Sequence, residues 1–367
     1  MSYDYLIVGA GFAGSTLAER LASACDARVL VVDARRHVGG NAYDPLDEHG
    51  VRVHRYGPHI FHTSSPRVVN YLSRFTSWRP YVHRVLASVN GRDVPLPICS
   101  KTLAALYGVD LNPAQMRAFF DERRERFGPV RNSEQAIVSQ VGRELFDTLF
   151  AGYTRKQWGC EARELDPSVC GRLPVRTNDD DRYFSDTFQA MPADGYEALF
   201  SRMLDHPNIE VALGQRFEDL PKTERYDHLI YTGPIDAYYK YCFGPLPYRS
   251  LEFVFETHRV ERYQAAAVVN YPGPEPFTRV SEFKHLTGQS HRWTTIAREY
   301  PGDTGDPYYP IPSPANREAY AKYHAKAAVE PRVTFVGRLA EYRYYNMDQV
   351  VASALATFDE LADERVA

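Results

Sequence analysis

The sequence is poor in cysteine, lacks long apolar runs and has no excess of charge of one sign. Its five cysteines are odd in number and widely spread along 367 residues, which fits reduced thiols better than a disulfide framework. No segment approaches the about 18 apolar residues of a membrane span, and no basic-then-apolar leader precedes the first strand. A formal net charge of −4 favours neither nucleic acid nor an anionic membrane as partner. We therefore expect a cytoplasmic protein.

Tyrosine, in contrast, is abundant, with 26 residues. Most of these side chains are expected in ordinary half-buried packing, but the ring also suits stacking on bases and its hydroxyl suits hydrogen bonds to phosphates. The length of the chain suggests two or three domains.

The first strand and helix carry the glycine spacing of a dinucleotide-binding unit. Residues 5–24 read YLIVGAGFAGSTLAERLASA, with Gly9, Gly11 and Gly14 between an apolar strand and a helix. Such glycines permit a tight turn and close approach of the backbone to a pyrophosphate at the helix N-terminus. A second strand, ARVLVVD, ends at Asp33, nineteen residues after Gly14, where a carboxylate can bind the adenosine ribose.

The next segment, ARRHVGGNAYD at 34–44, separates two kinds of cofactor. A basic residue followed by Gly39 and Gly40 resembles the second fingerprint of FAD-dependent glutathione-reductase-like and amine-oxidase-like families, and a plain glycine-rich turn is the alternative. No second G-x-G-x-x-G follows, so we expect no separate nicotinamide domain of that kind. FAD would stay bound, and an external reductant would reduce it.

Two histidines, His59 and His62, lie in the segment GPHIFHT directly after this fingerprint. The spacing could indicate a metal site, but no other His/Cys cluster has matching ligand spacing, so we expect no metal. Two structural histidines remain the plain alternative. Ser65 and Pro66 then predict the N-cap and first turn of a helix.

The remainder of the chain predicts a helical insertion and a β-rich region. Helices are expected within 112–163. Asn112 and Pro113 form a helix start signal, and Ile137, Val141, Leu145 and Leu149 recur every four residues. Residues 227–233 and 332–337 predict strands that return to the nucleotide-binding fold. Residues 250–260, 265–272 and 278–285 predict an antiparallel sheet. The predicted fold class is therefore α/β.

Five segments in this order resemble bacterial UDP-galactopyranose mutases: GGNAYD, YGPHIFHT, FAGYTRKQWG, TRVSEFKH and FVGRLAEYRYYNMDQV. The resemblance runs from about residue 3 to about residue 360. It implies a discontinuous Rossmann-like FAD-binding domain (1–68, 190–234 and 328–367), a helical-bundle insertion (98–163) and a twisted antiparallel substrate sheet (69–97, 164–189 and 235–327). A homodimer is a further family-level expectation.

The resemblance also implies an isomerase, in which UDP-galactopyranose and UDP-galactofuranose interconvert without net redox change but only with reduced FAD. In the implied mechanism, N5 of the reduced flavin attacks the anomeric carbon, UDP leaves, and a flavin–sugar iminium forms before the ring closes again. The protein then supplies position and electrostatics. The product would serve the biosynthesis of cell-surface polysaccharides.

By the same resemblance, Arg172 and Arg279 hold the diphosphate and sugar, and guanidinium groups suit a phosphate that gains charge as it leaves. Tyrosines 309 and 344 match phosphate-binding tyrosines, whereas the other aromatic matches face sugar, uracil or uridine, with core packing as the alternative. The implied substrate residues are Phe150, Tyr153, Trp158, Phe184, Asn270, Tyr309, Tyr344 and His83.

On the cofactor side, the resemblance makes His62 a histidine whose loop moves as the flavin is reduced, so that it stabilises the reduced form. His59 is expected to be structural and adjacent to the cofactor. The implied cofactor residues are Gly9, Gly11, Phe12, Ala13, Gly14, Asp33, Ala34, Arg35, Gly40, Asn41, His59, Arg338, Tyr345, Asn346, Met347 and Asp348.

Two positions depart from the family pattern, Phe188 and Ala297, and each is either neutral or a change in the sugar nucleotide that fits. A mutase acting on another nucleotide sugar is therefore the alternative function. An amine-oxidase-like flavin oxidoreductase and a non-catalytic nucleotide-sugar binder are the rivals from other classes.

Overall fold

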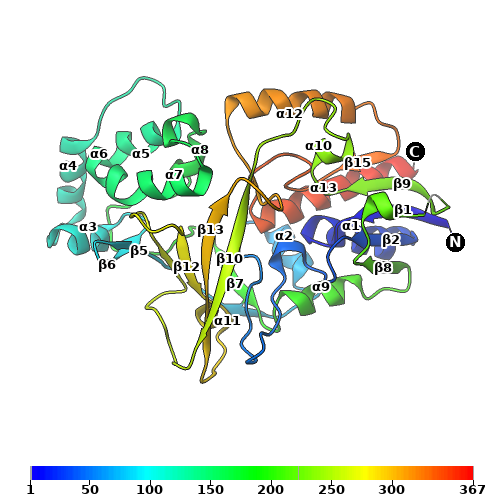
Figure 1. Cartoon of the computed structure of the whole chain (residues 1–367), viewed down its shortest axis with the longest axis horizontal. Coiled ribbons are helices and arrows are strands. Elements are labelled where there is room, and N and C mark those ends of the chain that lie inside the picture. The colour runs from blue at the N-terminus through cyan, green and yellow to red at the C-terminus, as the bar shows by residue number, and fades with distance from the viewer. Residues whose placement is uncertain (1, 222, 367) are drawn as a thin grey trace.

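The computed structural model describes residues 2–221 and 223–366, and its first layer is a five-stranded parallel sheet. The strand order is β15-β9-β1-β2-β8, and Figure 1 shows this sheet at the end of the molecule where both termini lie. The strands are β1 (Ser2–Val8), β2 (Val29–Asp33), β8 (Ile209–Leu213), β9 (Arg225–Tyr231) and β15 (Val333–Phe335). They come from three separate parts of the chain.

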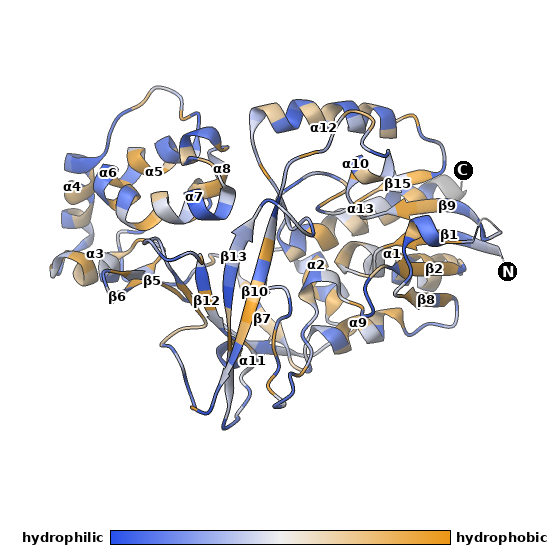
Figure 2. Ribbon diagram, viewed as in Figure 1, coloured by the Kyte–Doolittle hydropathy of each residue, from blue (hydrophilic) through white to orange (hydrophobic). Residues whose placement is uncertain are grey.

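The buried apolar residues of β1 and β2 are typical of parallel strands that are covered on both faces. Leu6, Ile7 and Val31 have no exposed surface, and most of β2 is hydrophobic in Figure 2. Helices α1 (Phe12–Cys25) and α13 (Met347–Val366) pack together over one face. The first turn of α1 also packs closely on the turn that follows β1. This contact requires Gly14, because a Cβ there would lie 1.9 Å from the carbonyl oxygen of Gly9.

A seven-stranded, mostly antiparallel sheet forms the second layer, in the order β14-β10-β13-β12-β11-β5-β6. Its strands are β5 (Val85–Val89), β6 (Arg92–Leu96), β10 (Tyr248–His258), β11 (Val268–Asn270), β12 (Arg279–Glu282), β13 (Thr294–Gly302) and β14 (Tyr309–Pro310). A small sheet joins β3 (Phe61–Thr63), β7 (Phe188–Pro192) and β4 (Trp78–Pro80). It connects the histidine loop to the region between the two larger sheets.

The third part is helical and lies at the other end of the molecule in Figure 1. It contains α3 (Ser100–Tyr107), α4 (Pro113–Arg123), α5 (Ser133–Val141), α6 (Arg143–Phe146), a π-helical turn (Asp147–Ala151), α7 (Gly152–Trp158) and α8 (Ser168–Gly171). The N-caps predicted from sequence are confirmed: Asn112 accepts hydrogen bonds from two amides at the start of α4, and Ser65 accepts one at the start of α2 (Pro66–Leu72).

The four-residue period at 137–149 does not correspond to one helix. Gly142 has φ +88 and ends α5, and the helix resumes and widens into the π-helical turn. A Cβ on Gly142 would lie 2.5 Å from the carbonyl oxygen of Arg123, so α4 packs directly on this break. Apolar periodicity reports which residues face the core but does not report such interruptions.

The remaining helices are α9 (Tyr196–Leu204), α10 (Ile235–Tyr238), α11 (Phe283–Thr287) and α12 (Pro314–Ala327), with 3₁₀ turns at Gly40–Ala42, Ala162–Glu164 and Phe217–Asp219. Helices α12 and α8 lie near predicted domain boundaries. Helix α12, placed with the antiparallel sheet, packs its buried Tyr323 in a cluster with Tyr239 and Phe335 at the edge of the parallel sheet. Helix α8 extends the helical part beyond 163 because it packs on α5.

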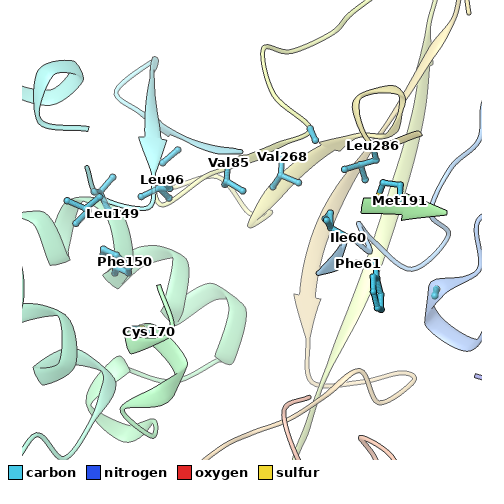
Figure 3. Close-up of a cluster of buried hydrophobic side chains, with 14 of the residues drawn as sticks. Ile60, Phe61, Val85, Leu96, Leu149, Phe150, Cys170, Met191, Val268 and Leu286 are labelled. Carbon is cyan, nitrogen blue, oxygen red and sulfur yellow. The ribbon is translucent and has the colours of Figure 1, made fainter. Parts of the chain in front are cut away.

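One continuous core joins the helical part to the antiparallel sheet. Figure 3 shows Leu149 and Phe150 on the helical side, Leu96 and Val268 in the sheet, and Phe61 beyond it.

Within residues 2–221 and 223–366, no helix combines the length and the apolarity needed to cross a bilayer.

The substitution Gly142→Ala should lower the free energy of unfolding by about 1–3 kcal/mol, because it strains the backbone and contacts Arg123. Urea unfolding measures the change. Gly50→Ala is the matched control, since Gly50 also has positive φ (+82) but a Cβ there meets no atom within 4 Å. Equal losses in both variants would contradict a role for the Arg123 contact.

Candidate active site

A cleft at the carboxyl ends of the parallel strands contains most of the residues predicted for the cofactor. We call it the glycine cleft; it has a volume of about 420 Å³. The predicted residues that line it are Gly9, Gly11, Phe12, Ala13, Asp33, Ala34, Arg35, Gly40, Asn41, His59, Arg338 and Met347. Of the others, Gly14 packs beneath the turn, Tyr345 and Asn346 line a neighbouring cavity, and Asp348 lines neither.

The glycine cleft has the features that a pyrophosphate requires. Helix α1 begins at Gly11 without a capping side chain and without an acidic residue in its first turn, so its N-terminus can accept an anion. Gly40 approaches Gly11 closely: a Cβ on Gly40 would lie 3.1 Å from the Gly11 Cα. Gly40, which also has a positive φ of +55, therefore favours glycine, and the residues present fit a dinucleotide.

Asp33 holds the turns on either side of the cleft. Its carboxylate accepts hydrogen bonds from the amides of Ala10 and Arg35, each at 2.8 Å. The Arg35 guanidinium donates to Asn41 Oδ1 at 2.8 Å and lies 4.2 Å from the Tyr56 ring centroid. The predicted acidic residue thus orders the site, and its contact with a ribose stays a prediction.

Sequence reasoning missed several residues of this cleft, among them Gln215, Phe217, Thr232, Tyr308 and Gly337. Thr232 follows β9 and Gly337 follows β15, so the rule that ligands bind beyond the carboxyl ends of parallel strands could have found these two. Gln215 and Phe217 follow the edge strand β8, which we had not predicted.

A second cavity of about 400 Å³ adjoins the first, and we call it the arginine cavity. His59, Arg338 and Met347 line both spaces. Predicted residues that line the arginine cavity are His62, His83, Arg172, Phe184, Asn270, Arg279, Tyr309 and Tyr344. Segments far apart in the sequence therefore converge here.

Arg279 is fixed in this cavity by a carboxylate. It lies opposite Glu299 on the neighbouring strand β13, and its Nε and Nη2 donate to the two carboxylate oxygens, both at 2.8 Å. Burial lowers the pKa of Arg279, but Glu299 and the nearby Tyr153 outweigh burial and hold that pKa above its ordinary value. The remaining N–H groups form a fixed cationic donor set.

Arg172 supplies a second cation from a less constrained position. It follows α8, its side chain is exposed, and it donates to the Tyr344 hydroxyl at 2.7 Å. Its guanidinium also lies 4.9 Å from the Tyr344 ring centroid. Because a tyrosine rather than a carboxylate holds it, Arg172 keeps its full charge available for an anion.

The tyrosine wall of the cavity consists of Tyr309 and Tyr344, whose ring centroids lie 5.5 Å apart. Trp158 packs behind both, with centroids 5.5 Å from Tyr344 and 6.2 Å from Tyr309. Burial, followed by the carboxylate of Glu299, raises the pKa of Tyr309 to about 12. Its hydroxyl therefore stays protonated and can donate to a phosphate.

Three predicted substrate residues do not line the arginine cavity. Phe150 lies in the shared core, and Trp158 lies behind the tyrosine wall. Tyr153 is close enough to Arg279 for each to shift the pKa of the other. Direct contacts of these three residues with a ligand stay predictions.

The two departures Phe188 and Ala297 also lie outside the cavity lining. Phe188 packs on Phe61 and Trp78, and Ala297 is buried in β13. Their positions give no support to a change in substrate.

Two family models match separate parts of the chain. Residues 148–344 match the family model for UDP-galactopyranose mutase, and residues 7–75 match an NAD(P)-binding Rossmann-like domain. The Klebsiella pneumoniae protein named "Probable UDP-galactopyranose mutase" is 42% identical over 97% of this chain and 94% of its own length.

The chain belongs to the UDP-galactopyranose mutase family.

Other relatives extend the comparison. The dTDP-fucopyranose mutase of Escherichia coli is 39% identical over 95% of this chain and 96% of its own length. The crystal structure of a reduced UDP-galactopyranose mutase has a TM-score of 0.80 at 16% identity and covers 99% of this chain and 96% of its own. A putrescine oxidase double mutant has a TM-score of 0.60 at 12% identity, with 99% of both chains covered. At these identities, the two structures show a shared fold.

The two histidines of the segment 57–63, His59 and His62, are both held by hydrogen bonds. His62 Nδ1 bonds to Asp186 Oδ2 at 2.7 Å, and the His62 ring stacks on Phe184 with centroids 3.5 Å apart. His59 Nδ1 donates to the carbonyl oxygen of Gly57 at 2.8 Å, and the His59 amide donates to His54 Nδ1 at 3.0 Å. Sequence reasoning missed Asp186, because 124 residues separate it from His62.

Three histidines of this region are neutral. Burial lowers the pKa of His54 and His83 to about 3 and that of His59 to about 4, and the charges of Arg279 and Arg338 reinforce the shift at His59. Across residues 2–221 and 223–366, no group of three His, Cys, Asp or Glu side chains is arranged to hold a metal ion.

The pKa of His54 predicts a pH-dependent stability. Below its ordinary pKa of about 6.5, the unfolded chain binds a proton that the folded chain does not, so stability is complete above pH 6.5 and falls toward pH 3. His54→Asn, which retains an acceptor for the His59 amide, should reduce this slope by about 1.4 kcal/mol per pH unit. Urea unfolding at pH 7.5 and 5.0 measures the slope.

Phe283→Leu is the control for this prediction. Phe283 stacks on the His54 ring with centroids 5.6 Å apart but does not titrate. The substitution Phe283→Leu should lower the free energy of unfolding equally at both pH values. If the free energy of unfolding of wild type and of His54→Asn changed in parallel with pH, the low pKa assigned to His54 would be refuted.

Proposed function

We propose that the protein interconverts the pyranose and furanose forms of a nucleotide sugar, with UDP-galactose as its substrate, and that it uses reduced FAD. The observation that carries the proposal is the convergence of Arg172, Arg279, Tyr309 and Tyr344 on one cavity that shares a wall with the glycine cleft. Two cations and two phenol donors suit a diphosphate next to a cofactor. The relatives named for pyranose mutase activity support the choice of reaction.

The residues of the glycine cleft would hold FAD, with its pyrophosphate at the N-terminus of α1 and its ribose near Asp33. Reduced FAD, when bound, supplies a nucleophilic ring nitrogen for displacement of UDP from the anomeric carbon. Arg338 donates to the carbonyl oxygens of Tyr308 and Tyr345, and it lies between the two spaces. It is placed to fix the boundary between cofactor and substrate.

The protein's own contribution is to stabilise the departing diphosphate. The charge on the diphosphate increases as the bond to the sugar breaks, so fixed cations stabilise the transition state more than the ground state. Arg279 is preorganised by Glu299, whereas Arg172 is held by the neutral hydroxyl of Tyr344 and has no carboxylate partner within hydrogen-bond distance among the described residues. Protonated Tyr309 adds a neutral donor.

His62 would stabilise the reduced cofactor. Its Nδ1 is bonded to Asp186, and its Nε2 has no hydrogen-bond partner among the residues that the structure describes. The ring lines the arginine cavity close to His59, which lines the glycine cleft as well. An external reductant, a cytoplasmic location and a homodimer complete the proposal.

A second candidate substrate is dTDP-fucose. The relative named dTDP-fucopyranose mutase is only slightly less similar than the relative from Klebsiella pneumoniae, 39% against 42% identity, so overall identity does not separate the two nucleotides. Both substrates carry the same diphosphate. The cavity residues that bind it therefore serve either reaction.

An oxidase function is less well supported, although a putrescine oxidase shares the fold. Oxidation of an amine needs no paired arginines in the substrate site. Arg172 and Arg279, two of the cationic side chains that line the arginine cavity, favour a substrate with two phosphates.

The first experiment incubates the purified protein with UDP-galactofuranose, with and without dithionite, and follows UDP-galactopyranose by chromatography. We expect conversion only under reduction. A parallel series with dTDP-fucofuranose compares the two values of kcat/KM. No conversion of either sugar by yellow, reducible protein would refute the proposal, and oxygen consumption with an amine would support the oxidase.

Arg172→Ala should lower kcat/KM by about 100-fold or more, because it removes a positive charge at the leaving group. Arg279→Lys should lower kcat/KM by about 100-fold, because lysine keeps the charge but loses the fixed fork of N–H donors. Arg279→Lys is used at the second site, since Arg279→Ala would leave buried Glu299 unpaired and destabilise the protein. The FAD absorbance per chain should stay unchanged in both variants.

Arg84→Ala is the control, because Arg84 pairs with Asp181 outside the arginine cavity. It should retain kcat/KM. Near-normal turnover in Arg172→Ala and Arg279→Lys would refute the assignment of the diphosphate site.

A further inference from the structure

The ammonium group of Lys156 lies among four backbone carbonyl oxygens of one loop. Lys156 Nζ donates to the carbonyl oxygens of Tyr271 at 2.6 Å, Gly273 at 3.0 Å, Glu275 at 2.9 Å and Phe277 at 3.0 Å. An ammonium has three N–H donors, so one of them is shared. The loop is therefore wrapped around a single cation that belongs to another element, α7.

The composition of the loop explains why it depends on an outside donor. Residues 271–277 read YPGPEPF, so three of the seven residues are proline. Proline has no backbone N–H and cannot hydrogen-bond a carbonyl group. The ammonium of Lys156 supplies the donors that the loop itself lacks.

This loop joins two strands that each end in a residue of the arginine cavity. Asn270 is the last residue of β11, and Arg279 is the first residue of β12. The amide of Tyr271 donates to the carbonyl oxygen of Thr278 at 2.8 Å, and the amide of Thr278 donates to that of Glu299 at 2.9 Å. A displaced loop would move the polar ends of both strands.

Helix α7 connects the same loop to the tyrosine wall. Its residue Trp158 packs behind Tyr309 and Tyr344. Its first residue, Gly152, lies against the loop, since a Cβ there would be 2.1 Å from the carbonyl oxygen of Pro272. The helix backbone and the loop are thus in direct contact.

A second cation holds the C-terminal end of α7. Arg249 on β10 donates from Nε to the carbonyl oxygen of Gln157 at 2.9 Å and from Nη2 to that of Lys156 at 3.1 Å. Carbonyl groups at a helix C-terminus have no partner within the helix, so these bonds fix the end that carries Trp158. The helix is held on the sheet by Lys156 through the loop and by Arg249 through β10.

We propose that Lys156 is a positioning residue: it fastens the 271–277 loop to α7 and so sets the distance between the Asn270–Arg279 side of the arginine cavity and its tyrosine wall. The occupant of this cavity, a UDP-sugar, rests on the proposed function. The contact between loop and helix does not rest on it.

Lys284 in α11, the helix that directly follows β12, provides a matched control. Its side chain is 1% exposed, and its ammonium donates to the carbonyl oxygen of His291, but it does not line the arginine cavity. Lys284→Met therefore makes the same chemical change as Lys156→Met, away from the proposed contact.

The first readout is hydrogen exchange of the full-length holoprotein, which needs no substrate. In Lys156→Met, the amides of Tyr271 and Thr278 should exchange about tenfold faster or more, because the loop loses charge-assisted hydrogen bonds. Amides of β1 should keep their wild-type rates. Lys284→Met should leave Tyr271 and Thr278 unchanged. Wild-type exchange at both amides in Lys156→Met would overturn the proposal.

The second readout is the affinity for UDP, measured by calorimetry. Lys156→Met should weaken UDP binding by about tenfold and raise KM more than it lowers kcat, since the binding groups remain but their spacing changes. FAD content should stay constant. Equal loss of UDP affinity in Lys284→Met and Lys156→Met would overturn the positioning role, because it would reflect general destabilisation.

The two hypotheses fail separately. A wild-type protein that binds neither UDP nor dTDP would refute the proposed function, and the exchange rates of Tyr271 and Thr278 would still decide the role of Lys156. If Lys156→Met does not fold, Lys156→Gln replaces it, since glutamine keeps two N–H donors and loses the charge. The same rates then support or overturn the proposal.

Discussion

A cation buried at a binding site needs a fixed counter-ion, and Arg279 has one in Glu299. The carboxylate is 1% exposed and lies directly opposite Arg279 across the β12–β13 pair. The pairing of β12 with β13 thus sets the position of the Arg279 charge, and this charge shifts the pKa values of neighbouring side chains. His59 and His83 stay neutral beside Arg279, and Tyr309 stays protonated between Arg279 and Glu299. His59, His83 and Tyr309 therefore add no charge of their own next to Arg279.

Local sequence predicted the parts of the fold that depend on neighbouring residues. The strand, glycine turn and helix of 5–24 and the N-caps Ser65 and Asn112 follow from the backbone requirements of those few positions. The break at Gly142 was missed because the apolar period continues through it. The packing of α12 depends on the tertiary fold, which brings Tyr323 and Phe335 into one cluster.

The same distinction applies to the site. Resemblance to a family identified Arg172 and Arg279, and the structure brings both to one cavity. Glu299, Asp186 and Arg249 were not predicted, because each contacts its partner through bonds between distant parts of the chain. Alternation and spacing show which residues share a face, but they do not show which side chain completes the hydrogen bonds of another.

The two adjoining spaces share His59, Arg338 and Met347. A substitution at any of these three positions changes the lining of both spaces. A change that accommodates a new sugar would therefore also alter the surface proposed for the cofactor. Other residues of the arginine cavity, such as Tyr183 and Val268, line that cavity but not the glycine cleft. Substitutions that change the substrate range are therefore expected to accumulate at such residues, and the three shared positions should change last.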